Sequence, residues 1–253
     1  MLAPSLIIAR KEILDHSRDI RSLVSSVFYA LMGPLVVLLV SLAKPGSAKS
    51  GESLAVLVGM MSVFALVAAF VGGNNLAMDA IAGERERRSL LPLLLNPVRR
   101  RDVLIGKWLA IGLFAAGGLT INLLGFAILF HQSWHVWCMI ALGLLPLALF
   151  AAALELLISA GSSNAKEAHT YLSLLVFLPM GAGMFVVFFP QAVGGWRSLL
   201  PVIGHQSFIE VCIRGEVSPV RSIVLAMITL ASVSVALWGA GKMLSRDEVV
   251  YGG

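Results

Sequence analysis

The residues best suited to chemistry in this sequence form a block of acids and bases near position 85. Five consecutive charged side chains make up this charged block: Glu84, Arg85, Glu86, Arg87 and Arg88. Ion pairs between such side chains and another protein mostly fix orientation and the choice of partner. A helix from Asp79 to about Leu95 would also pair Glu84 with Arg88, but such a pair contributes only about 0.2 to 0.5 kcal/mol. The block therefore indicates a docking surface, and the alternative is a membrane-orientation signal beside interfacial leucines.

A leucine-rich stretch and a turn follow the charged block. Pro92 lies among five leucines and would loosen a helix there, and the dipeptide Asn96-Pro97 is a turn signal. Three arginines and a Gly-Lys pair then lead into the next apolar segment. We expect a hinge that carries movement of the charged block into this segment, formed by Pro92, Asn96, Pro97, Gly106 and Lys107.

Motifs for nucleotide binding and hydrolysis are missing. The run from Gly239 to Lys242 lacks the first glycine and the Ser/Thr of a phosphate loop, and neither HExxH nor G-x-S-x-G occurs. His131 and His135 are spaced to share a metal on a helix, but no third ligand is near, and two tryptophans indicate an interfacial loop. We therefore expect no catalytic residue, no metal and no cofactor on this chain, so ATP would have to act through another polypeptide.

Composition indicates that membrane helices position these residues. Hydrophobic residues make up 58% of the 253 positions and charged residues 13%, with a mean hydropathy of +0.90, whereas about 25% of residues are charged in soluble proteins. Crossing about 30 Å of hydrocarbon takes about 20 apolar residues in a helix, and several segments reach that length. The strand alternation of a membrane barrel is absent. The predicted fold class is an all-α integral membrane protein.

The expected order of elements is one transmembrane domain over residues 1–253. It begins with an amphipathic interfacial helix within 1–22. Six spans are predicted: about 23–43, 53–78, 103–130, a fourth ending near 159, 170–189 with a kink at Pro179, and 220–243. A charged connection occupies 79–102 between the second and third spans. Glycines and prolines break up 190–219, which favours short re-entrant helices between the fifth and sixth spans.

Basic residues predict the orientation of the six spans. Fourteen lysines and arginines fall on the side that holds both termini and the charged block, and five fall on the other side. The positive-inside rule makes the richer side cytoplasmic. The net charge of +5 is explained by these membrane-flanking cations and by contact with the lipid bilayer, so we expect no nucleic-acid partner.

Two polar side chains within the spans are candidates for a translocation path. Glu155 lies in the fourth span, where a carboxylate costs about 2.5 to 3.5 kcal/mol to insert; it lines a substrate or ion path, pairs with a neighbouring helix or snorkels to the inner interface. Asn122 in the third span either contacts a ligand or forms a hydrogen bond between helices. Cys138 and Cys212 are both expected toward the outer face, as free thiols or as one disulfide.

The run GERERRSLLPLLLNPVRRRDVLIGKWLA resembles the signature of type-2 ABC exporter permeases, especially their sodium-extrusion-like and multidrug-like branch. The resemblance extends over the whole chain, through ARKEI near the start, SSNAKEA after the fourth span and RDEVV after the sixth. It implies a permease subunit of an ATP-driven exporter in a bacterial cytoplasmic (inner) membrane.

Further expectations follow from this resemblance. Glu84 to Arg87 would belong to a coupling helix seated in a groove of a cytoplasmic ABC ATPase, which would bind ATP and Mg. Two such ATPases and a second permease, identical or paralogous, would complete the dimer, and an extracytoplasmic accessory protein could join it. Phe208 and Glu210, in the re-entrant segment, would lie at an outer gate.

Two other function classes remain as alternatives. An ion-coupled secondary transporter or channel would carry several ionisable residues at mid-membrane and often an inverted repeat, whereas this chain offers one glutamate near a span end. An intramembrane enzyme is less favoured because no catalytic motif is present.

Overall fold

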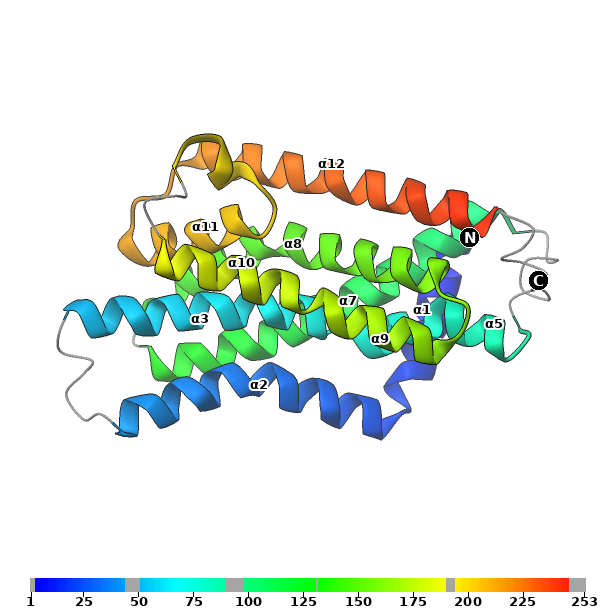
Figure 1. Ribbon diagram of the computed structural model, residues 1–253, viewed down its shortest axis with the longest axis horizontal. Coiled ribbons are helices and arrows are strands. Elements are labelled where there is room, and N and C mark those ends of the chain that lie inside the picture. Colours follow the sequence, from blue (N-terminus) through cyan, green and yellow to red (C-terminus); the bar gives the residue numbers. More distant parts are fainter. Residues whose placement is uncertain (1–2, 44–50, 90–97, 131, 190–193, 246–253) are drawn as a thin grey trace.

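The chain forms a bundle of helices along one axis, as a computed structural model shows for residues 3–43, 51–89, 98–130, 132–189 and 194–245 (Figure 1). Those ranges contain helices and no strand, which confirms the predicted all-α class. The helices in chain order are α1 (Pro4–Ser17), α2 (Ile20–Ala43), α3 (Gly51–Val71), α4 (Asn74–Met78), the π-helix η2 (Asp79–Gly83), α5 (Glu84–Glu86), α7 (Arg100–Leu129), α8 (Trp134–Gly161), α9 (Ala165–Leu175), α10 (Phe177–Phe188), the 3-10 helix η4 (Gly195–Leu199), α11 (Ile203–Arg214) and α12 (Pro219–Leu244).

Six helical segments are long and apolar enough to cross a membrane, which confirms the six predicted spans. They are Ile20–Ala43, Val56–Glu86, Arg100–Leu129, Trp134–Gly161, Ala165–Phe188 and Pro219–Leu244. The second of them continues through α4, η2 and α5, so the start of the charged block lies on the same helical segment as the span.

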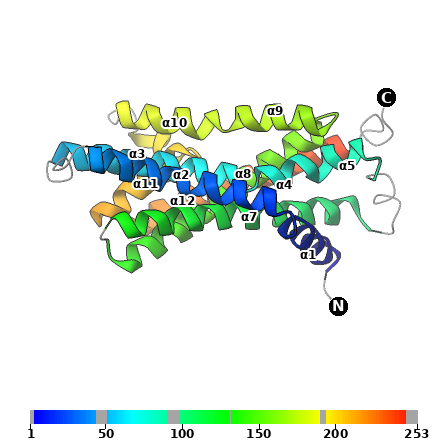
Figure 2. The same ribbon diagram turned by 90° about the horizontal axis from the view of Figure 1, so that it is seen from below.

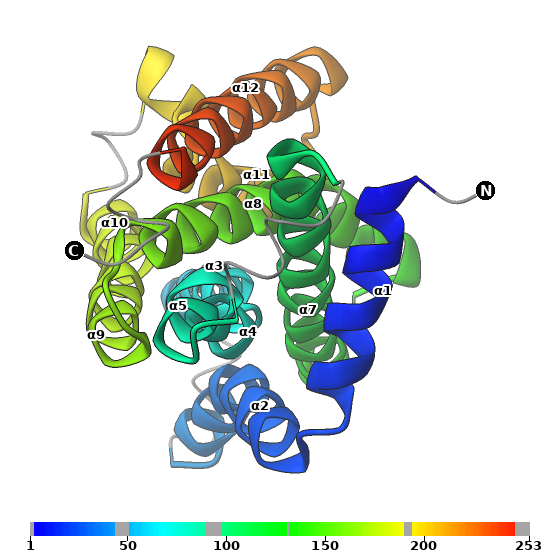
Figure 3. The ribbon, with the colours of Figure 1, turned by 90° about the vertical axis from the view of Figure 1, so that its right-hand side faces the viewer.

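This second span is the centre of the bundle. Its apolar window is 67% buried, against 22% in the first, peripheral span. Seen along the axis, α3, α4 and α5 lie in the middle, with α2, α7, α8 and α9 around them (Figure 3). A displacement at one end of this central element would therefore reach most of the other spans.

Two spans are less regular than a plain apolar run. The second is interrupted at Gly72 and Gly73 and then passes through the π-helix, where the sequence predicted an unbroken helix to about Met78. The fifth is divided at Val176. Pro179 has no N–H for the carbonyl of the residue four positions earlier, so the helix is weakened at the site where the sequence predicted a kink.

The N-terminal segment also divides. α1 ends at Ser17 and α2 begins at Ile20, because the Asp19 carboxylate accepts hydrogen bonds from the backbone N–H of Arg21 and the hydroxyl of Ser22 and so starts a new helix. α1 then lies across α7 instead of continuing into the first span (Figures 2 and 3). At the opposite end of the bundle, η4 and α11 are the short helices predicted between the fifth and sixth spans.

Candidate functional site: the charged end of the bundle

One end of the bundle gathers most of the ionisable residues of the described chain. We call it the charged end; it consists of α1, α5, the start of α7, the α8–α9 turn and the last turns of α12 (Figure 1). The charged block begins there on α5, which places it at the tip of the central span.

Lys107 is the centre of this end. Its ammonium group donates to Glu84 Oε1 on α5 at 2.8 Å and to Glu12 Oε1 on α1 at 2.9 Å. The lysine side chain has no exposed surface, and the two carboxylate side chains are 12% and 13% exposed. Burying a charge is costly unless it is paired, so this three-residue cluster holds α1, α5 and α7 in one arrangement. Glu84 thus pairs with Lys107 and not, as the sequence predicted, with Arg88.

The close packing of α1 on α7 brings Glu12 within hydrogen-bond distance of Lys107. A Cβ atom at Gly106 would lie 2.6 Å from the carbonyl oxygen of Ser5, which is closer than non-bonded atoms approach. Only glycine leaves room for α1 at that point, and the approach brings Glu12 to the neighbouring Lys107. The Gly-Lys pair at 106–107 is therefore a packing and ion-pairing unit inside the continuous helix α7.

Arg85 and Glu86 tie α5 to the turn between α8 and α9. The Arg85 guanidinium donates to the carbonyl oxygens of Ala160, at 3.0 Å, and Ser162, which are free acceptors at the end of α8. Glu86 Oε2 accepts from the backbone N–H of Ala165 at 3.0 Å, the first residue of α9. Each charge matches the partial charge of the helix end it contacts.

The π-helix that precedes α5 is fixed from α8 as well. The hydroxyl oxygen of Ser159 accepts hydrogen bonds from the backbone N–H groups of Ile81, at 3.1 Å, and Ala82, at 3.2 Å. A buried serine thus supports the part of the second span that departs from α-helical geometry.

The rest of the charged block faces outward. Glu86, Arg87 and Arg88 are exposed, and Arg87 forms a surface ion pair with Asp79 at 3.4 Å. Arg88 has a φ of 55°, a left-handed conformation that ends the helix. The hinge residues Pro92, Asn96 and Pro97 lie outside the described residues.

A comparison with known proteins assigns this chain to a family. A family model described as "ABC-2 family transporter protein" matches residues 6–209. The chain belongs to the ABC-2 family of transporter proteins. Together with the six apolar segments, this makes it a multi-pass membrane permease subunit.

Three curated ABC-2-type relatives support the assignment. The ABC transporter permease protein NatB of Bacillus subtilis (strain 168) is 34% identical over 192 residues, 70% of this chain and 50% of that protein. The probable ABC transporter permease proteins NosY of Pseudomonas aeruginosa and Stutzerimonas stutzeri are 37% identical over 128 residues and 34% over 124 residues. These matches cover 47% and 46% of this chain and 42% and 41% of the NosY proteins. The chain spans about half the length of the curated relatives it matches.

The two path candidates of this permease differ in their contacts. Asn122 Nδ2 donates to the carbonyl oxygen of Ala30 at 2.7 Å and so joins α7 to α2. Glu155 is 1% exposed, and neither carboxylate oxygen has a hydrogen-bond partner among the described residues. Its carboxylate lies against the break at Gly73, where a Cβ atom would be 2.7 Å from Glu155 Oε2.

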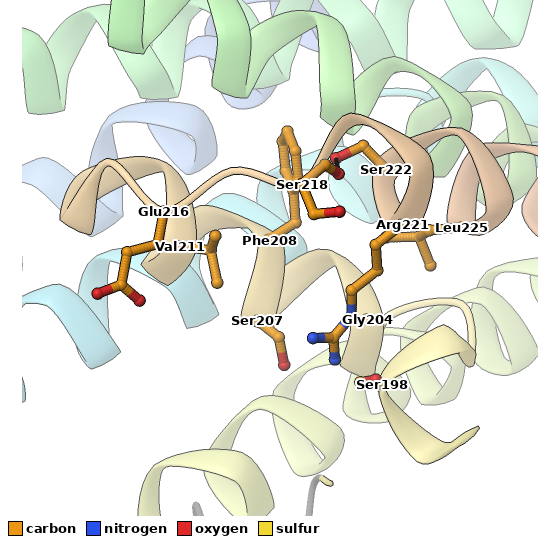
Figure 4. Close-up of a pocket in the computed structure, with 10 residues that line it drawn as sticks. All are labelled: Ser198, Gly204, Ser207, Phe208, Val211, Glu216, Ser218, Arg221, Ser222 and Leu225. Carbon is orange, nitrogen blue, oxygen red and sulfur yellow. Dashed lines mark hydrogen bonds between the residues drawn. The ribbon is translucent and has the colours of Figure 1, made fainter. Parts of the chain in front are cut away.

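The gate candidates of the permease lie on α11 at the opposite end. Phe208 packs its ring on Gly143 of α8 and lines a cavity of about 180 Å³ between α11 and α12 (Figure 4). Four serines and Arg221 supply polar groups around that cavity, whereas the Glu216 carboxylate points away from its centre (Figure 4). Glu210 is half-buried, and burial raises its pKa.

Several residues with clear roles here were not singled out from the sequence. Glu12 and Ser159 form hydrogen bonds at the charged end although they are far from the charged block in sequence. His205 on α11 is fully buried, and this burial lowers its pKa to about 4. The sequence offered no local signal for the role of Glu12, because it lies among other charged residues in ARKEI. Cys138 and Cys212 are free thiols, so the disulfide alternative is wrong.

Proposed function

We propose that this permease couples ATP hydrolysis on a separate cytoplasmic ABC ATPase to export of a substrate across the membrane. The permease would bind the ATPase through its charged end, and ATP and Mg would be held by that partner. Both termini would then be cytoplasmic, in the inner membrane of a bacterium.

The observation that carries this proposal is the continuity of α5 with the central span. Residues from Val56 to Glu86 form one helical segment with a short break at Gly72 and Gly73. Its tip is fixed to α7 and the α8–α9 turn by Glu84, Arg85 and Glu86, and to α1 through Lys107. A push on this tip is passed to several spans together, because paired buried charges resist separation. Such a rigid connection suits the conversion of ATPase closure into helix movement.

The contacts also divide the charged block by role. Glu84 and Arg85 form hydrogen bonds within the permease. They would therefore support the docking surface without contacting the ATPase themselves. Arg87 and Arg88 are exposed and would face the ATPase. Charges at the rim of an interface mainly set orientation and association rate, as expected for a partner that is chosen among several ATPases.

The same proposal extends to the assembly of the transporter and to the substrate path. We propose two permease halves, identical or paralogous, with two ATPases, and an outer gate at Phe208 and Glu210. Glu155 is the better path candidate, since the amide of Asn122 is already used between helices.

Co-expression with candidate ABC ATPases from the same genome tests the docking surface. The double variant R87E/R88E is expected to lower ATPase co-purification and stimulation of ATP hydrolysis at least tenfold, because it reverses two exposed charges without touching a buried pair. The matched control R214E/R221E reverses two exposed arginines at the opposite end and is expected to bind normally. Equal ATPase binding by the wild type and R87E/R88E would contradict the proposal.

A further inference from the structure

A groove of about 620 Å³ lies between the start of α7 and the last turns of α12 at the charged end. α12 packs chiefly on α8, so the last turns of α12 leave the start of α7 uncovered along the groove. The residues that determine its chemistry are Arg100, Arg101, Leu104, Leu237, Trp238 and Lys242.

The groove is basic at its mouth and apolar along its wall. Arg100 and Arg101 come from the first turn of α7, and Lys242 comes from the last turn of α12; all three are exposed. Leu104 and Leu237 line the wall. No acidic side chain lines the groove among the described residues. No carboxylate of a described residue therefore compensates its three cations there.

Two contacts set the basic mouth in place. An Arg100 guanidinium nitrogen donates to the carbonyl oxygen of Leu244 at 3.4 Å, across the groove. The Lys242 ammonium lies 5.4 Å from the centre of the Trp238 ring, within cation–π range. Trp238 is 68% exposed, and tryptophans with this exposure beside basic residues are typical of the headgroup level of a membrane.

The outer face of α12 supports a lipid neighbour. Large apolar side chains are exposed along its length, namely Val220, Ile223, Met227, Val235 and Trp238. Such a row is stable only against hydrocarbon or another apolar surface. A second copy placed on the same groove by two-fold symmetry would bring two sets of three cations together, which disfavours that occupant.

We propose that this groove binds one anionic phospholipid. Its phosphate would lie among Arg101, Lys242 and Arg100, and an acyl chain would follow Leu104 and Leu237. Basic pockets between spans at a membrane surface favour anionic headgroups, and the apolar wall distinguishes a lipid from a soluble phosphate. This inference rests on the fold alone and is independent of the ATPase partner.

Lipid titration of the purified full-length chain in detergent, followed by native mass spectrometry, tests the site. Dioleoyl phosphatidylglycerol is expected to bind at least tenfold more tightly than dioleoyl phosphatidylcholine. The variant R101Q/K242Q is expected to lower phosphatidylglycerol affinity about ten- to thirtyfold, since each basic residue near the membrane surface strengthens binding about fivefold. Its affinity for phosphatidylcholine should not change.

The matched control is R10Q/R21Q, which removes two exposed arginines from the same end of the bundle, outside the groove. It is expected to change phosphatidylglycerol affinity less than threefold, and glycerol 3-phosphate should not compete. Equal affinity for the two lipids, an equal loss in the control, or displacement by glycerol 3-phosphate would each overturn the proposal. So would loss of lipid as the chain dimerises, because the groove would then be covered by protein.

Discussion

Two buried ionisable side chains of this permease contrast sharply. At the charged end, Lys107 has two carboxylate partners within 2.9 Å. In the neighbouring inner half of α8, Glu155 is equally buried and has no hydrogen-bond partner among the described residues. A charge with short, buried partners fixes one arrangement of its helices, whereas an unpartnered one fixes none. The charged end is thus held in one arrangement by ion pairs, whereas no described hydrogen bond of the Glu155 carboxylate holds the helices around it.

Removing Lys107 would leave buried carboxylates at the charged end without a cationic partner, as the Glu155 carboxylate is without a partner among the described residues. The variant Lys107→Met leaves two carboxylates facing each other in a buried site, and breaking a buried pair in this way costs about 3 to 5 kcal/mol. Chemical denaturation in detergent, followed by tryptophan fluorescence, measures the loss.

A rescue variant separates charge from packing. In Lys107→Met combined with Glu12→Gln and Glu84→Gln, no buried charge remains, and at least half of the lost free energy of unfolding should return. If the triple variant is as unstable as the single one, the cluster acts through packing and the contrast with Glu155 is lost.

The close contact of α1 with α7 can be tested at Gly106. The variant Gly106→Ala forces Ser5 and Ile8 of α1 away from α7, and overpacking of this kind costs about 1 to 3 kcal/mol. Gly117, on the same helix, is the matched control because a Cβ there meets nothing within 4 Å. Gly117→Ala should raise the free energy of unfolding by about 0.5 to 1 kcal/mol, the usual helix preference for alanine. Similar effects at both glycines would mean that α1 is not held at this contact.

The smallest expected effect on stability is at Glu155. Since no partner is lost, Glu155→Gln should leave the free energy of unfolding unchanged or raise it by up to about 2 kcal/mol, part of the cost of inserting a carboxylate. A loss above about 1 kcal/mol would reveal a hidden partner and remove the contrast with Lys107. Transport measured on the same variant adds a second readout: a fall without loss of stability would support a place on the path.

The sequence predicted the large features because they follow from composition. Apolar segments of about 20 residues located all six spans, and Pro179 marked the weakened part of the fifth. Gly72 and Gly73 lie in close contact with α7, and Gly73 also with α8. They also mark a break in the second span. A hydropathy profile does not detect such a break, because the residues before and after it can be equally apolar.

The partners of the charged block were beyond the sequence for a different reason. Pattern rules pair residues three or four positions apart, so they favoured Arg88 for Glu84. The actual partner, Lys107, is brought there by the return of the chain through α7, and Glu12 by the crossing of α1 over Gly106. Such contacts depend on tertiary register, which no local pattern encodes.

The π-helix at Asp79–Gly83 has a consequence for how the second span can turn. A π-helical turn contains one more residue than an α-helical turn, and one residue of α-helix corresponds to about 100° of rotation. Conversion of η2 to α-helix would therefore rotate α5 by about that angle relative to α3 and release Ser159 from its two backbone donors. The central span thus contains, just before its charged tip, a π-helical turn whose conversion would rotate that tip without unfolding the rest of the span.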